Sequence, residues 1–177
     1  MSRLSLALAR TALALAAVTL AGGAPVHAAD VAKTVGTFDA WAAYTYGDGG
    51  ARLCYMYATP QKSQGEYTRR GDTFIQVSHR PGEKSFDVVS VTAGYSYKPD
   101  SEAEIEIDGT KYALFTKDDG AWARDARDDA RLVTAMKAGA AMVVRGVSAR
   151  GTLTIDSYSL KGFTAAHAAI DKACGVR

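Results

Sequence analysis

The chain has 177 residues, 47% of them hydrophobic and 23% charged, with 21 Lys and Arg against 19 Asp and Glu. This length suits one domain with a sizeable core. The charges nearly balance, and we find no basic stripe interleaved with aromatic residues, which argues against a nucleic-acid-binding protein.

The N-terminus has the organisation of an export signal. Arg3 and Arg10 supply a positive start, an apolar run of Leu, Ala and Val follows, and residues 26–28 are compact enough for a peptidase site. We predict cleavage after Ala28, so that residues 1–28 are a signal peptide and residues 29–177 form a single exported domain in the periplasm or outer envelope. No later apolar run approaches the ~20 residues of a transmembrane helix, so we expect no transmembrane span.

Two cysteines, Cys54 and Cys174, lie near opposite ends of the mature chain. In an oxidising compartment an even pair of cysteines is expected to form a disulfide. Closing so long a loop stabilises a protein by up to about 5 kcal/mol in the chain-entropy model. The chain has no C-x-x-C pair, so a structural bridge is favoured over a redox-active thiol.

Strand patterns fill most of the mature chain, and its prolines fall between them. We predict strands over residues 36–46, 51–59, 73–79 and 86–97, a hairpin over 102–115, and strands over 141–147 and 152–158. About eight strands predict a mainly β, β-sandwich-like domain, with a closed barrel as the alternative.

The hairpin should turn at Asp108-Gly109, a pair that tolerates positive φ. The register that follows pairs Ile107 with Thr110, Glu106 with Lys111 and Ile105 with Tyr112. One side of this hairpin is apolar and the other carries opposite charges, as cross-strand energetics favour.

Helical patterns interrupt the strands twice. We predict a short helix over residues 128–138, before the last hairpin, and a C-terminal helix over residues 164–174. Their apolar faces are formed by Leu132, Val133 and Met136 in the first helix, and by Phe163, Ala166, Ile170 and Ala173 in the second.

Candidate binding residues are aromatic or basic. Trp122, flanked by alanines, is the best candidate for an exposed anchor, and the arginines at 124, 127 and 150 accompany it as possible partner-binding residues. Tyr95 and Tyr97 are possible aromatic ligand-binding residues, although core packing is the more frequent role of such tyrosines. These six residues are Trp122, Arg124, Arg127, Arg150, Tyr95 and Tyr97.

No catalytic or metal-binding set is evident. His79 and His167 stand alone in sequence without ligand-like spacing, and an ordinary structural role is far more frequent for such residues. The acidic residues between 118 and 129 lack the order of a calcium loop and alternate with arginines. We therefore expect no cofactor, no metal and no enzymatic activity.

Short motifs spread over most of the mature chain resemble those of the invasion-associated locus B (IalB) family. The motifs are VTAGYSYK at 91–98, IDG at 107–109, LFT at 114–116, AWA at 121–123, LVTAM at 132–136, MVV at 142–144, RGT at 150–152 and YSLKGF at 158–163. The resemblance implies a small exported bacterial protein of the periplasm or outer envelope with a β-sandwich-like domain. Some relatives are associated with entry into host cells, and the resemblance implies no reaction.

Three hypotheses for function follow. The first is a non-enzymatic envelope protein that binds another envelope component or a host-surface protein through a loop edge carrying Trp122 and the arginines. The second is a glycan-binding or small-molecule-binding β-sandwich that uses its tyrosines. The third is a hydrolase of envelope polymers acting through carboxylates that the sequence does not identify.

Overall fold

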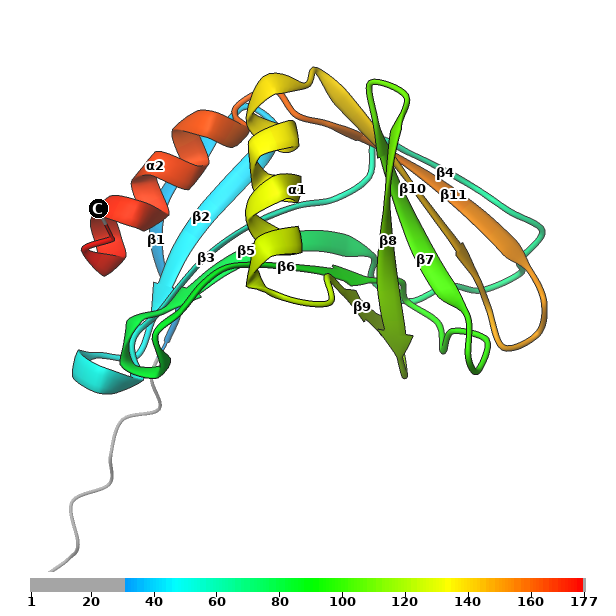
Figure 1. Cartoon of the computed structure of the whole chain (residues 1–177), viewed down its shortest axis with the longest axis horizontal. Coiled ribbons are helices and arrows are strands. Elements are labelled where there is room, and N and C mark those ends of the chain that lie inside the picture. Colours follow the sequence, from blue (N-terminus) through cyan, green and yellow to red (C-terminus); the bar gives the residue numbers. More distant parts are fainter. Residues whose placement is uncertain (1–30, 177) are drawn as a thin grey trace, which may run out of the picture.

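A computed structural model describes residues 31–176 as a mainly β domain with two helices (Figure 1). This confirms the predicted fold class, including a short helix before the last hairpin and a helix at the C-terminal end. The signal peptide and cleavage site predicted within residues 1–28 lie outside the described residues.

Within residues 31–176 the strands form one antiparallel sheet, in the order β1-β2-β3-β5-β6-β9-β8-β7-β10-β11-β4. The strands are β1 (Lys33–Phe38), β2 (Trp41–Tyr46), β3 (Leu53–Ala58), β4 (Lys62–Gln64), β5 (Phe74–Arg80), β6 (Ser85–Thr92), β7 (Glu102–Ile107), β8 (Thr110–Lys117), β9 (Gly120–Trp122), β10 (Ala141–Val147) and β11 (Leu153–Ser159). The helices are α1 (Ala126–Ala138) and α2 (Phe163–Cys174), with short 3-10 turns at Gly49–Ala51 and Pro81–Glu83.

The sheet bends so that its two ends approach each other. Only residues 59–61 separate β3 from β4, yet β4 pairs with β11 at the far edge of the sheet. The four Cα–Cα steps from Ala58 to Lys62 span at most about 14 Å, so this edge must lie near the end of β3. The indole N–H of Trp41 on β2 also donates to the carbonyl of Ser159 on β11 at 3.1 Å. A single bent sheet thus takes the place of the two sheets of an ordinary sandwich.

Two of the predicted strands differ from the observed ones because the backbone turns within them. The pattern over residues 36–46 is a hairpin of two strands, because Asp39 turns the chain at a φ of 49°. The strand predicted over 86–97 ends at Thr92, because Gly94 adopts a φ of 71° beside the backbone of Gly71. Two three-residue strands, β4 and β9, were too short for the sequence pattern to indicate.

The β7–β8 hairpin has the predicted register. Ile107 pairs with Thr110, Glu106 with Lys111 and Ile105 with Tyr112 across a turn at Asp108 and Gly109.

Both helices cover the inner face of the sheet (Figure 1). α2 packs on β1, β2, β3 and β5, where Phe163 meets the edge of the Trp41 ring at 4.9 Å, and α1 packs on β6. Asp125 caps α1 by accepting the backbone N–H groups of Arg127 and Asp128, both at 2.9 Å, as the start of a helix requires. Neither helix of residues 31–176 has both the length and the apolar character needed to cross a membrane.

Candidate functional site

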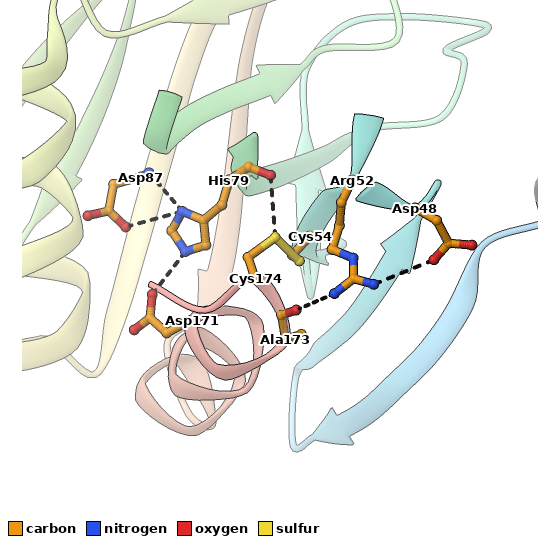
Figure 2. The surroundings of a disulfide bond; sticks show 8 residues. All are labelled: Asp48, Arg52, Cys54, His79, Asp87, Asp171, Ala173 and Cys174. Carbon is orange, nitrogen blue, oxygen red and sulfur yellow. Dashed lines mark hydrogen bonds and ion pairs between the residues drawn. A yellow bond between two sulfur atoms is a disulfide. The ribbon is translucent and has the colours of Figure 1, made fainter. Parts of the chain in front are cut away.

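The predicted disulfide is present and fixes the end of α2. Cys54 on β3 bonds to Cys174 with their Cα atoms 6.0 Å apart (Figure 2). Arg52 reinforces this junction, because its guanidinium donates to the carbonyl of Ala173 at 3.3 Å and contacts Asp48 at 3.5 Å. The C-terminal helix is therefore joined covalently to the strand that carries Cys54, and by a hydrogen bond to Arg52, the residue just before that strand.

Trp122, at the end of β9, and Arg124 lie close together just before α1 in the chain. The Trp122 ring stacks on Phe115 of the neighbouring strand β8 with centroids 5.7 Å apart, and both rings are partly exposed. Arg124 pairs with Glu102, which lies opposite Phe115 in the β7–β8 register. These four residues form what we call the Trp122 edge.

The other two predicted arginines lie in different surroundings. Arg127 is in the first turn of α1 and lines a shallow hollow with Tyr112 and Arg131. Arg150 is in the turn between β10 and β11, where it lines a hollow that is more enclosed and larger than the one beside Arg127. The structure thus separates Arg150 from the Trp122 edge, although the sequence predicts one loop edge that carries both Trp122 and Arg150.

The hollow that Arg150 lines has a volume of about 590 Å³ and opens between residues 66–70, which follow β4, and the β10–β11 turn. We call it the Arg70 hollow. Its lining residues are Glu66, Tyr67, Thr68, Arg69, Arg70, Tyr95, Ser96, Ser148, Ala149, Arg150, Thr152 and Thr154. Exposed Arg69 and Arg150 contribute positive charge at its surface, and Glu66 is its one lining carboxylate.

Arg70 is held rigidly in the wall of this hollow. Its Nη1 and Nη2 donate to the two carboxylate oxygens of Asp156 on β11, both at 2.7 Å, and its Nε donates to the carbonyl of Ala93 at 2.6 Å. The two side chains are only 7% and 3% exposed. Burial alone would lower the pKa of Arg70, but the hydrogen bonds and charge of Asp156 outweigh it and raise that pKa. The guanidinium is therefore a permanent, fixed cation.

Two tyrosine rings flank the Arg70 guanidinium. Its central carbon lies 5.1 Å from the ring centre of Tyr95 and 5.7 Å from that of Tyr67, within cation–π range. The Tyr95 hydroxyl is 2.6 Å from the Thr154 hydroxyl, and burial raises the pKa of Tyr95. Tyr97 meets the Tyr95 ring edge-on at 5.3 Å but is only 6% exposed and does not line the hollow. Of the two predicted ligand-binding tyrosines, the structure places Tyr95 at a hollow and Tyr97 in the core.

A second group of titratable side chains lies beside the disulfide. His79 on β5, Asp87 on β6, and His167 and Asp171 on α2 bring their ring nitrogens and carboxylate oxygens within 4.8 Å of one another. We call this group the histidine cluster. Figure 2 shows His79 between Asp87 and Asp171, next to Cys174.

The contacts of this cluster differ in kind. The backbone N–H of Asp87 donates to Nδ1 of His79 at 3.0 Å, and Nε2 of His167 is 2.7 Å from an oxygen of Asp87. Oxygens of Asp171 lie 3.0 Å from Nε2 of His79 and 3.0 Å from Nδ1 of His167. Neither of those two nitrogens has a well-directed hydrogen-bond partner, so their contacts with Asp171 are short but poorly aligned.

Sequence reasoning missed this cluster because α2 is distant in the chain from the β5–β6 hairpin, to which the other two residues belong. One signal was present, since His167 and Asp171 are four residues apart and share a helix face. The other half depends on Asp87, whose left-handed φ of 58° follows an irregular β5–β6 pairing between Ser78 and Arg80. No two-residue periodicity predicts that irregularity.

Two histidines and two aspartates are also the ligand types that zinc prefers. The observed hydrogen bonds do not fit a metal site, however. Since Nδ1 of His79 accepts the N–H of Asp87, the proton of the neutral ring lies on Nε2, the atom that would have to bind a metal in contact with Asp171. A metal-bound histidine normally donates from its other nitrogen, whereas here that nitrogen accepts.

Burial and neighbouring charges shift the acidity of two members of the cluster. Burial lowers the pKa of His79, although Asp87 and Asp171 act in the opposite direction. The hydrogen bond with His167 lowers the pKa of Asp87, and the charges of His167, His79 and Lys137 add to that effect. The fold thus favours a neutral His79 and an ionised Asp87.

Comparison with known proteins gives one match. Residues 41–171 match the family model described as "Invasion associated locus B (IalB) protein". No curated protein and no solved structure matches the chain. The matched segment includes both the Arg70 hollow and all four residues of the histidine cluster.

Proposed function

The chain belongs to the invasion-associated locus B family, and from this premise we propose that it is a non-enzymatic binding protein of the bacterial envelope. In this proposal residues 1–28 direct export and are removed after Ala28. The mature domain then acts in the periplasm or outer envelope and binds an envelope component or a host-surface molecule at the Arg70 hollow.

The observation that supports this proposal most is the fixed position of Arg70 between Asp156, Tyr67 and Tyr95. Binding sites gain affinity when their polar groups are already oriented, because little ordering remains to be done. The hollow also has a volume within the range of about 300–1,000 Å³ that small-molecule sites occupy.

The chemistry of the lining indicates the class of ligand. Tyr67 and Tyr95 offer ring surface, the hydroxyls of Thr152 and Thr154 offer hydrogen bonds, and Arg69 and Arg150 offer positive charge. This combination favours a molecule with both a flat apolar face and a carboxylate or other anionic group. An acidic glycan fragment of the envelope has both features.

The Trp122 edge favours a second candidate, a partner protein. Its stacked Trp122 and Phe115 rings remain partly exposed, and aromatic residues with a neighbouring arginine are frequent at the centres of protein interfaces. Arg124 at this edge is more than half exposed.

In-cell crosslinking separates the two candidates. The tagged protein would be crosslinked, captured from the envelope fraction and studied by mass spectrometry, in wild type and in two matched variants. Tyr67→Ala with Arg150→Ala alters the hollow, and Trp122→Ala with Arg124→Ala alters the edge; each removes one aromatic and one arginine. We expect the hollow variant to lose the captured component and the edge variant to retain it. The reverse result would assign binding to the Trp122 edge.

A thermal-shift measurement tests the ligand class. The probes are peptidoglycan fragments that carry carboxylates, with neutral oligosaccharides of similar size as the control. We expect the acidic fragments to raise the melting temperature of the wild type and to lose this effect in the Arg150→Ala variant. Equal shifts with neutral sugars, or none with either, would rule out an acidic glycan as the ligand.

A further inference from the structure

A second proton on His79 would compete with a hydrogen bond that the ring already accepts, although a carboxylate oxygen of Asp87 lies 3.9 Å from the same nitrogen. The His79 side chain is fully buried, and its Nδ1 accepts the backbone N–H of Asp87 at 3.0 Å. A protonated imidazole donates from both nitrogens. A proton on Nδ1 of His79 would therefore face the N–H of Asp87, and the hydrogen bond between these two groups would break.

That bond stabilises an unusual piece of backbone. Asp87 has a φ of 58°, a conformation that costs a residue with a side chain of this kind about 1 kcal/mol or more. The same residue presents its carboxylate to Nε2 of His167 at 2.7 Å. Loss of the His79 contact would therefore loosen both the start of β6 and its contact with α2.

Charged groups from three elements face this point. Asp87 belongs to β6, and His167 and Asp171 belong to α2. From α1, the charge of Lys137 lowers the pKa of Asp87, and the charge of Asp87 raises the pKa of Asp129. Asp87 and Asp171 favour a charged His79, whereas burial and His167 oppose it. Burial is the larger influence, because the imidazole has no access to water.

We propose that the histidine cluster is an acid-sensitive latch that fastens the C-terminal half of α2 to the β5–β6 hairpin. The latch is closed while His79 is neutral and loosens when His79 takes a second proton. The Cys54–Cys174 bond keeps the end of the helix attached, so that opening is local and reversible. This inference does not depend on the ligand proposed for the Arg70 hollow.

The direction of the pH effect follows from the lowered pKa of His79. An open or unfolded chain protonates this ring near its ordinary value of about 6.5, and the closed structure does not. The stabilisation by the latch is therefore complete above about pH 6.5 and declines as the pH falls below it. Asp87, whose pKa is lowered, stays ionised through this range and loses its own contribution only below about pH 4.

Hydrogen–deuterium exchange of the mature protein tests the proposal at pH 7.5, 6.5 and 5.5 in buffer with EDTA. After correction for intrinsic exchange, we expect protection of α2 and of residues 79–87 to fall by up to about tenfold per pH unit below 6.5. The β7–β8 hairpin, whose neighbours in the sheet are β9 and β10, should keep its protection. Unchanged protection of α2, or equal loss in both regions, would overturn the proposal. If EDTA itself loosened α2 at pH 7.5, the cluster would be a metal site and the latch would be wrong.

Two further measurements connect the effect to His79. His79→Asn keeps an acceptor near the Nδ1 position but cannot be protonated, so we expect α2 protection in this variant to be independent of pH between 7.5 and 5.5. Because this buried substitution can prevent folding, the second measurement uses the wild type. The NMR titration of the His79 ring should have its midpoint below 6.5 and coincide with the change in the α2 amides. A ring that titrates while those amides stay protected would contradict the latch.

Discussion

The Arg70–Asp156 pair and the histidine cluster are both charged groups inside the same domain, but they are built differently. Arg70 meets Asp156 through two parallel hydrogen bonds of 2.7 Å, and a third bond satisfies its Nε. The histidine cluster includes two buried nitrogens without a directed partner. Arginine also stays charged at any physiological pH, whereas histidine changes charge between about pH 5 and 8.

This difference separates a rigid site from an adjustable one. The Arg70 pair stabilises one arrangement of the hollow at every pH at which the protein folds. The histidine cluster links its arrangement to proton concentration. Burial alone therefore does not define the role of a titratable group, because the completeness of its hydrogen bonding decides whether it can change its protonation state.

The largest expected effect concerns the rigid pair. Arg70→Met would leave Asp156 buried without a partner, which we expect to lower the free energy of unfolding by about 3–5 kcal/mol. Arg70→Met combined with Asp156→Leu removes both charges and should restore most of the loss. Urea unfolding at pH 7.5 measures both variants. A single variant that loses less than about 1 kcal/mol would show that water reaches Asp156, and the hollow would not be rigid.

Removal of the disulfide should have the next largest effect, and this effect should be centred on α2 and the histidine cluster. Replacing Cys54 and Cys174 together by serine opens a loop of 120 positions, and we expect a loss of about 2–4 kcal/mol in urea unfolding. Exchange protection should fall first in α2, beside the histidine cluster. Tyr95 and Arg70 should keep their arrangement, which can be followed from the NMR signals of the Arg70 guanidinium. An earlier loss at Arg70 than in α2 would contradict this division of the molecule.

Gly94 lies beside the segment that carries Arg70, and Gly109 provides a matched control for its replacement. A Cβ at Gly94 would lie 2.5 Å from the carbonyl oxygen of Gly71, next to Arg70, and the residue has a φ of 71°. Gly109 has a similar φ of 79° with nothing within 4 Å. We expect Gly94→Ala to cost about 1–3 kcal/mol and Gly109→Ala about 1 kcal/mol or less, both by urea unfolding. Equal costs would mean that the segment at Gly71 moves freely and does not hold Arg70 in place.

The sequence predicted those parts of the fold that depend on neighbouring residues. Asp108 and Gly109 determine the hairpin register because a two-residue turn with positive φ allows only one pairing. The α2 helix follows from its apolar stripe, and the disulfide follows from having two cysteines in an expected oxidising compartment.

The candidate sites depend on contacts that no local pattern contains. Arg70 and Asp156 are 86 positions apart and meet because the segment after β3 crosses to the far edge of the sheet. His79 gave no signal because its contact with Asp87 depends on the irregular β5–β6 pairing and its other partners lie on α2. Tyr95 and Tyr97 follow the same alternation, yet β6 ends at Thr92, so the two tyrosines lie outside the strand and alternation cannot indicate that only Tyr95 lines the hollow.

Replacing Asp129 should have the smallest effect on stability, and it would show how much of the acid response belongs to the histidine cluster. Burial raises the pKa of Asp129 to about 6, although the hydrogen bond from the N–H of Val89 at 2.9 Å acts in the opposite direction. A raised pKa means that this carboxyl favours folding when protonated, fully so below about pH 4, and loses that contribution as the pH rises through 6. Asp129 and His79 therefore titrate in neighbouring ranges with opposite effects on stability.

Asp129→Asn separates the two contributions. It keeps an oxygen to accept the Val89 N–H and removes the buried charge, so we expect a gain of about 1 kcal/mol at pH 7.5 that disappears near pH 4. Since the variant lacks the carboxyl that opposes His79, its stability should also fall more steeply than that of the wild type between pH 6.5 and 5. Urea unfolding at several pH values measures both slopes. If the slopes were equal, Asp129 would titrate outside this range, and the acid response of the wild type would belong to the histidine cluster alone.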